Sequence, residues 1–453
     1  MLNTFLLCRG MVSCNMSRNS CLKLAYNWVA NNPRKRKENI MHSFINESDF
    51  FAGNSPEKIA ETYGTPIYVY NEKILRARMS SVANAITKYP YRASFSVKAN
   101  TNIHILKIAL EEGNNCDAMS VGEIQMALRA GFPVDRIFFV PNNVSAEEMQ
   151  FAIDHNIMTS CDSLEQLELY GSLNPGGRVA VRINPGVGAG HHDKVLTGGK
   201  KTKFGISEEF VPRIFEIVAR YNLTIAGINQ QIGSLIMETK PYLDSVTNLL
   251  RIAMNFKNLE FIDFGGGFGV PYHKLDDEKD FPMDDLRAQL EPILDDFVEK
   301  YGSVPMFYSE PGRFCVAEGG VILGRVHAIK HNADRTYVGT DVGMNVLVRP
   351  SMYDSWHDIE VIRGDTVVSR DEMKKQMVVG NICESGDIIA RDRMLPEMQR
   401  GDLVCVLDAG AYGWSMCSTY NSRPRPAEVL ICADGGIKLI RRRETLEDLM
   451  VLF

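Results

Sequence analysis

The sequence predicts an α/β protein in which a (β/α)8 TIM barrel is combined with a second, antiparallel β domain. Eight short apolar runs alternate with segments of helical periodicity between residues 94 and 311, as expected for parallel strands covered by helices. Polar side chains and glycines gather at or near the ends of these runs. Beyond about residue 316 the helical periodicity largely disappears until residue 444.

The strands of the barrel are predicted at 94–98, 116–120, 137–141, 157–163, 179–185, 224–234, 261–267 and 306–311. Helices are predicted between them, for example at 121–130, 146–155, 208–220, 242–256 and 284–300. An open doubly wound sheet is the alternative architecture. It is disfavoured because no G-x-G-x-x-G motif follows the first strand.

The remainder of the chain is predicted to form the β domain. Its segments alternate or run apolar with turn residues between them, at 321–330, 358–363, 375–381, 403–408 and 428–432. The expected division is a barrel at 75–315 and a β domain composed of 41–74 and 316–453. No Pro-, Gly- or Ser-rich linker separates the two, so we expect them to pack together.

Residues 1–40 differ in composition and are excluded from the fold prediction. They hold seven basic side chains, one acid and three of the ten cysteines. An organellar transit peptide is one interpretation. A disordered tail, or an upstream start codon before a natural start at Met41, is favoured because the segment has no clear amphipathic period.

The overall composition excludes several classes of protein. A formal net charge of -6 argues against a nucleic-acid binder, and no run approaches the ~18 apolar residues of a membrane-spanning helix. Ten cysteines without a C-x-x-C pair are too sparse for a disulfide scaffold. These features indicate a reduced, cytoplasmic protein.

Candidate functional residues lie where a barrel places its active site, at the carboxyl ends of the strands. These positions carry Lys98, Asp117, Asn142, Asp162, Arg182, Gln231, the Gly265–Gly267 run and Glu310. At the end of a buried strand Lys98 would lose hydration, which lowers its pKa and favours Schiff-base chemistry. A lysine that reaches solvent along its own stem is the structural alternative.

The glycine run and the acid after the last strand suggest a cofactor site. Gly265, Gly266 and Gly267 allow backbone N–H groups to approach an anion, and Arg313 follows Glu310 by three residues. An acid and an arginine beside an anion loop suit pyridoxal phosphate, whose pyridine nitrogen the acid keeps protonated. The alternative for the glycine run is a flexible turn. The alternative for Glu310 and Arg313 is a surface ion pair.

Two segments of the β domain also carry reactive groups. Cys383, in Cys383-Glu384-Ser385-Gly386-Asp387, is a candidate proton donor, and Arg349 with Tyr353 is a candidate carboxylate site. An ordinary turn and a solvated loop are the alternatives. His191-His192-Asp193 is rejected as a metal site, because three adjacent residues do not easily converge on one ion. We expect no metal.

Seven motifs occur together in an order that resembles the diaminopimelate decarboxylase family, which are fold-type-III pyridoxal phosphate enzymes. The resemblance runs from about residue 42 to the C-terminus. The motifs are SVKAN at 96–100, DFGGGFGVPY at 263–272, SEPGR at 309–313, RPSMY at 349–353, CESGD at 383–387, DAGAYG at 408–413 and NSRPRPAE at 421–428.

The resemblance implies a role for each matching residue. Lys98 would carry pyridoxal 5′-phosphate covalently, Glu310 would contact the pyridine nitrogen, and Cys383 would be the proton donor. The remaining cofactor contacts would be Ser234, Gly265, Gly266, Gly267, Gly312, Arg313 and Tyr412, and the substrate contacts Arg313, Arg349, Tyr353, Glu384 and Tyr412. Gln231 occupies the position of a histidine that stacks on the cofactor ring in the family, so a difference in ring placement, rate or substrate is expected there.

The resemblance further implies a homodimer whose subunits complete each other's sites through Cys383, Glu384 and sometimes Tyr412. The implied reaction converts meso-2,6-diaminopimelate to L-lysine and CO2, since two arginines fit a second carboxylate better than an ammonium group. A decarboxylase of ornithine, lysine, arginine or carboxynorspermidine is the first alternative. A non-catalytic regulatory homologue is the second. A racemase is the third, and CESGD argues against it.

Overall fold

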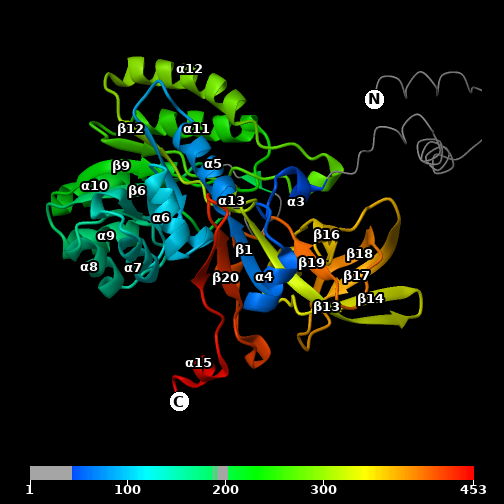
Figure 1. The fold of residues 1–453 in the computed structure, drawn as a ribbon. Helices are drawn as coiled ribbons and strands as arrows, with labels where there is room; N and C mark the ends of the chain where they lie inside the picture. The colour runs from blue at the N-terminus through cyan, green and yellow to red at the C-terminus, as the bar shows by residue number, and fades with distance from the viewer. Residues whose placement is uncertain (1–42, 187–188, 191–201) are drawn as a thin grey trace, which may run out of the picture. The chain divides into compact units, whose positions relative to one another are not determined.

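Eight parallel strands close into a barrel in the computed structural model of this chain (Figure 1). Around the ring their order is β5-β4-β3-β2-β12-β11-β9-β6, and β5 also pairs with β6. The strands are β2 (Tyr91–Ser96), β3 (Asn115–Ala118), β4 (Ile137–Phe139), β5 (Met158–Cys161), β6 (Arg178–Asn184), β9 (Thr224–Asn229), β11 (Phe261–Asp263) and β12 (Met306–Ser309). The structure describes residues 43–186, 189–190 and 202–453. The predicted barrel is confirmed.

Several strands end earlier than predicted, because the chain turns where the polar residues begin. Strand β2 ends at Ser96, so Lys98 lies in the 3-10 turn η2 (Val97–Ala99) rather than on the strand. The strand predicted at 224–234 is interrupted, since β9 ends at Asn229 and residues 230–232 precede the short strand β10 (Gly233–Ser234). The site residues therefore lie on loops that the strand ends hold in place.

Helices cover the outside of the barrel (Figure 1). They are α5 (Glu72–Ala83), α6 (Ile103–Glu111), α7 (Val121–Ala130), α8 (Ala146–Asp154), α9 (Leu164–Leu173), α10 (Val211–Tyr221), α11 (Thr239–Ala253) and α12 (Met283–Tyr301). Caps explain where several begin: Ser120 Oγ accepts the N–H of Glu123 at the start of α7, and Ser145 with Glu148 forms a capping box on α8. The helix predicted from residue 208 begins instead as the 3-10 turn η5 (Glu208–Phe210).

A second sheet of ten strands forms the β domain. Its strands are β1 (Ile67–Asn71), β13 (Gly320–Asn332), β14 (Arg335–Thr340), β15 (Ile359–Arg363), β16 (Thr366–Val367), β17 (Met373–Val379), β18 (Ile388–Pro396), β19 (Leu403–Val406), β20 (Ala427–Ile431) and β21 (Ile437–Arg441). Most pairs are antiparallel, as predicted. Two pairs are parallel, β1 with β20 and β14 with β17. Parallel pairing is possible because a long stretch of chain connects the two strands of each pair.

The two sheets share one hydrophobic core, whose main cluster runs from barrel residues such as Phe95 to Val404 of the β domain. Helices α3 (Phe44–Glu47) and α4 (Pro56–Tyr63) cover a second cluster on the β domain. The boundaries predicted at 75 and 315 stay predictions, because residues 43–453 form one compact unit.

Some sequence-based expectations concern other parts of the chain. The leader at 1–40 and the rejected metal site His191-His192-Asp193 lie outside the described residues. Within the described ranges, no helix is both long and apolar enough to cross a membrane.

Candidate active site

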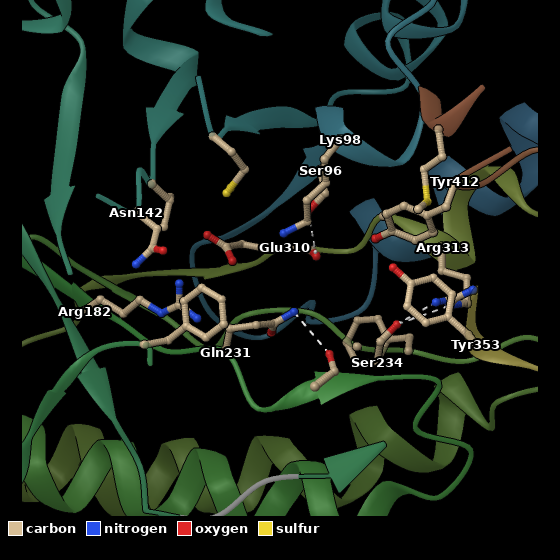
Figure 2. A pocket seen from close by; sticks show the side chains of 18 of the residues that line it. Ser96, Lys98, Asn142, Arg182, Gln231, Ser234, Glu310, Arg313, Tyr353 and Tyr412 are labelled. Carbon is tan, nitrogen blue, oxygen red and sulfur yellow. Dashed lines mark hydrogen bonds between the residues drawn. The ribbon is translucent and has the colours of Figure 1, made fainter. Parts of the chain in front are cut away.

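A cavity of about 430 Å³ opens at the carboxyl ends of the barrel strands, where the β domain adjoins them. Most of the predicted site residues line it: Lys98, Gln231, Ser234, Gly267, Glu310, Gly312, Arg313, Arg349, Tyr353 and Tyr412. Figure 2 shows Lys98 and Glu310 directed toward the same space, with Arg313 and the hydroxyls of Tyr353 and Tyr412 at the other end. The strand ends and the β domain thus build one site together.

Lys98 is half-buried, and the turn that carries it is hydrogen-bonded to the β domain. Asn100 Nδ2 donates to Gly410 O at 3.0 Å, and the N–H of Tyr412 donates to Ala99 O at 2.8 Å. Burial alone lowers the pKa of the Lys98 ammonium, but Asp117, Tyr412 and Glu310 together outweigh it and raise that pKa above its usual value. The expectation of a lowered pKa was therefore wrong, because it neglected the acids around the lysine.

Three buried carboxyl groups meet near Lys98. Asp117 is paired with Ser96 in the register of β2 and β3, and Asp263 ends β11. Burial raises the pKa of Asp263 to about 7. Burial, then Asp263 and Asp117, hold the pKa of Glu310 well above its usual range, although Lys98 and Arg182 oppose them. Within the described residues Glu310 Oε1 has no hydrogen-bond partner.

An anion cradle lies at the other end of the cavity. Arg313 donates from Nε and Nη2 to Ser234 Oγ, at 3.2 and 2.9 Å. Gly267 has a φ of +111°, a conformation that glycine tolerates, and a Cβ on Gly266 would lie 1.9 Å from Glu310 O. Only glycine fits this loop, and an anion bound here would lie close to both backbone and the Arg313 guanidinium.

Gln231 holds the glycine loop from the side of the cavity. Its Oε1 accepts the N–H of Gly266 at 2.8 Å, and its Nε2 donates to Gly233 O at 3.3 Å. Gly266 and Gly265 themselves do not line the cavity. Gln231 therefore anchors the loop in addition to facing the cavity.

The structure does not bring Cys383 and Glu384 to the cavity of their own chain. Both are exposed and belong to the loop between β17 and β18. The N–H of Cys383 donates to Asn421 Oδ1 at 2.9 Å, and Tyr420 OH donates to Glu384 Oε1 at 2.5 Å. The prediction that they complete a neighbouring subunit's site stays a prediction.

Two site residues were given no role from the sequence. Asp117 was recognised only as a polar strand end, and Tyr272 only as the last letter of a motif. The structure places Asp117 beside Lys98 and places the Tyr272 hydroxyl between Arg313 and Arg349, 2.7 and 2.8 Å from their Nη1 atoms. The position of Asp117 in the strand that follows the Lys98 strand was its only signal in the sequence, whereas no local pattern pointed to Tyr272.

The residues present fit pyridoxal phosphate. The unpartnered Oε1 of Glu310 suits a pyridine N–H, which the chain itself does not supply. The cradle of Ser234, Gly267 and Arg313 suits a phosphate, and Lys98 supplies the amine. The electrostatics of the site also fit this cofactor, since a cationic ring nitrogen would stabilise the ionised carboxylate of Glu310, which burial disfavours.

A barrel with this lysine, acid and anion cradle at its strand ends defines the class of barrel-fold pyridoxal-dependent decarboxylases. Accordingly, residues 72–317 match the family model for the pyridoxal-binding domain of the pyridoxal-dependent decarboxylases. The chain belongs to the diaminopimelate decarboxylase family, as its similarity to individual members shows.

Curated relatives match most of the chain. A diaminopimelate decarboxylase of Methanothermobacter thermautotrophicus is 40% identical over 408 residues, 88% of this chain and 94% of the relative. That of Escherichia coli K12 is 34% identical over 423 residues, 90% and 98% of the two chains. The crystal structure of the Helicobacter pylori enzyme complexed with L-lysine superposes with a TM-score of 0.79 at 32% identity, over 87% of this chain and 98% of the other.

Proposed function

We propose that this chain uses pyridoxal 5′-phosphate to decarboxylate meso-2,6-diaminopimelate to L-lysine and CO2, a step of lysine biosynthesis. The observation that carries the proposal is the buried guanidinium of Arg349 at the substrate end of the cavity, 2% exposed. No carboxylate in the described chain forms an ion pair with it or with Arg313. Because a buried cation needs an anion, this end of the cavity favours a substrate with a second carboxylate.

Nine of the residues that line the cavity have proposed roles in this reaction. Lys98 would hold the cofactor, Glu310 would accept from its ring nitrogen, and Ser234, Gly267, Gly312 and Arg313 would bind its phosphate. When bound, the cofactor accepts the electron pair released when the carboxylate leaves as CO2. Arg349, Tyr353 and Tyr412 would orient the substrate, and the burial of the site excludes water from the reacting carbon.

The proposal includes a homodimer in which Cys383 of one subunit donates the proton to Cα in the other subunit's site, beside Glu384. Supporting it, both side chains are exposed, and neither lines the cavity of its own chain. A two-fold dimer exchanges such loops reciprocally. A cytoplasmic location accompanies the biosynthetic role, and cell fractionation tests it.

The decisive experiment measures CO2 release by the cofactor-loaded protein from meso-diaminopimelate, L-lysine, L-ornithine, L-arginine and carboxynorspermidine. We expect meso-diaminopimelate to give the highest kcat/KM and L-lysine as product. A higher kcat/KM with any of the other four substrates would overturn the assignment of substrate. Absence of the bound cofactor's absorbance after addition of pyridoxal phosphate would overturn the assignment as an enzyme and favour a regulatory role.

A further inference from the structure

Arg349 is hydrogen-bonded to two residues, Tyr272 and His357, to which no role has yet been given. His357 in turn connects it to the backbone of the β domain. Arg349 Nη1 donates to Tyr272 OH at 2.8 Å and lies 2.9 Å from His357 Nε2. The other ring nitrogen, His357 Nδ1, lies 2.8 Å from Leu407 O. Arg349, His357 and the Tyr272 side chain are all buried.

The bonding partners fix the state of His357. A backbone carbonyl only accepts, so Nδ1 carries the hydrogen that it donates to Leu407 O. Nε2 then accepts from Arg349, and the imidazole is neutral. Burial lowers the pKa of His357 well below its usual value, and the cations of Arg349, Arg313 and Arg393 lower it further, although the Leu407 carbonyl opposes them.

The bonds also fix the direction of Arg349. Both use Nη1, and no other described hydrogen bond engages Nε or Nη2. The edge of the guanidinium that carries Nε and Nη2 is the edge that binds a carboxylate with two parallel bonds. The network therefore holds one corner of the guanidinium and leaves its two-donor edge for a ligand.

We propose that His357 and Tyr272 are positioning residues that orient Arg349 toward the far carboxylate of the substrate and so set the preference for carboxylate-bearing ligands. The inference rests on the proposed function, because it requires a substrate with a carboxylate at that end. Tyr272 OH also accepts from Arg313 Nη1 at 2.7 Å. Through it the substrate-binding arginine is placed relative to the anion cradle.

The test compares two ligands that differ only in the carboxylate, L-lysine and cadaverine (1,5-diaminopentane). Their dissociation constants are measured by titration calorimetry on the cofactor-loaded protein. Wild type is expected to bind L-lysine more tightly. His357→Phe and Tyr272→Phe are each expected to reduce the ratio of the two constants by about tenfold, the effect of losing a charge-assisted hydrogen bond. Cadaverine binding stays at the wild-type level.

Steady-state kinetics and two further variants separate a positioning role from a structural one. KM for meso-diaminopimelate is expected to rise more than kcat falls, and His357→Gln, which retains a donor and an acceptor, to recover part of the loss. Tyr170→Phe is the matched control, since it removes a hydroxyl that donates to Arg178 O at 2.6 Å outside the site. If His357→Phe does not fold, Tyr272→Phe and His357→Gln carry the test.

The other outcomes are distinguishable. An unchanged ratio in the variants would overturn the positioning role. So would an equal weakening of both ligands, because that is what a merely structural role produces. If wild type itself does not prefer L-lysine to cadaverine, the proposed substrate fails, and the inference fails with it for that separate reason.

Discussion

Gln231 and Gly266 are joined by a hydrogen bond that fixes the glycine loop, with 2.8 Å between Gln231 Oε1 and Gly266 N. Gln231→Leu removes the acceptor and leaves a buried N–H unpaired, at a cost of about 1–3 kcal/mol. We expect the affinity for pyridoxal phosphate to fall about tenfold, measured by equilibrium titration of the apoprotein.

Gln231→His tests the same position in the opposite direction. A neutral imidazole keeps an acceptor for Gly266 and adds an aromatic face to the cavity. We therefore expect this variant to retain or raise the affinity for the cofactor. A clear loss of affinity would show that the pocket has been rebuilt around glutamine.

Gly266→Ala probes the closest approach in the site. Its Cβ would meet the carbonyl oxygen of Glu310 at 1.9 Å, and backbone cannot give way as a side chain can. We expect the free energy of unfolding to fall by about 2 kcal/mol or more in a denaturant titration, together with weaker cofactor binding. Gly122→Ala in α7 is the control, because its Cβ makes an ordinary 3.6 Å contact and stability should not fall. Equal stability of the two variants would contradict the close approach.

Asp117→Asn tests the origin of the raised pKa of Lys98. Burial lowers that pKa, and Asp117 is the strongest of the groups that raise it. Removing its charge should lower the pKa of Lys98, so more neutral amine is present at a given pH. We expect the pH midpoint for the rate of cofactor capture by apoprotein to move to lower pH. Asp295→Asn, which removes an exposed acid paired with Lys88, should leave the midpoint in place. A shift toward higher pH would contradict the role of Asp117.

The positions of Lys98, Glu310 and the glycine run were predictable because each follows a buried apolar strand, and parallel strands deliver their ends to one edge. The strand limits themselves were predicted two residues too long at Lys98, and the break after Asn229 was not predicted. The hydrophobic pattern indicates which residues are buried, not which are hydrogen-bonded in a strand. The residues that follow the ends of β2 and β9 are still buried or half-buried, so the pattern continues past the strand.

The electrostatics and the His357 network were not predictable in the same way. The sign of the pKa shift at Lys98 depends on Asp117 in β3 and Glu310 directly after β12, which only the barrel register brings together. Tyr272 and His357 are 85 positions apart in the sequence, and their rings meet with centroids 5.1 Å apart only once the barrel and β domain have packed. Contacts between distant segments leave no local pattern to read.

Glu310→Gln tests the acid that faces the cavity. The substitution keeps the size of the side chain but removes its capacity to hold a protonated pyridine nitrogen as an ionised partner. We expect kcat for decarboxylation to fall on the order of 100-fold while the cofactor still binds. CO2 release in a single turnover, with cofactor content measured by absorbance, separates the two effects. An unchanged kcat would exclude Glu310 from the chemistry.

The shared-site proposal is tested by mixing two inactive variants. Lys98→Ala and Cys383→Ala are co-expressed with different affinity tags, and the doubly tagged dimers are isolated. If Cys383 serves the neighbouring subunit, one of the two sites in each mixed dimer carries both substitutions and the other carries neither. Randomly assembled dimers should then regain about a quarter of wild-type activity, and the isolated mixed dimers about half. If Cys383 acted on its own chain instead, each site would carry one substitution and the mixed dimers would remain as inactive as the parents.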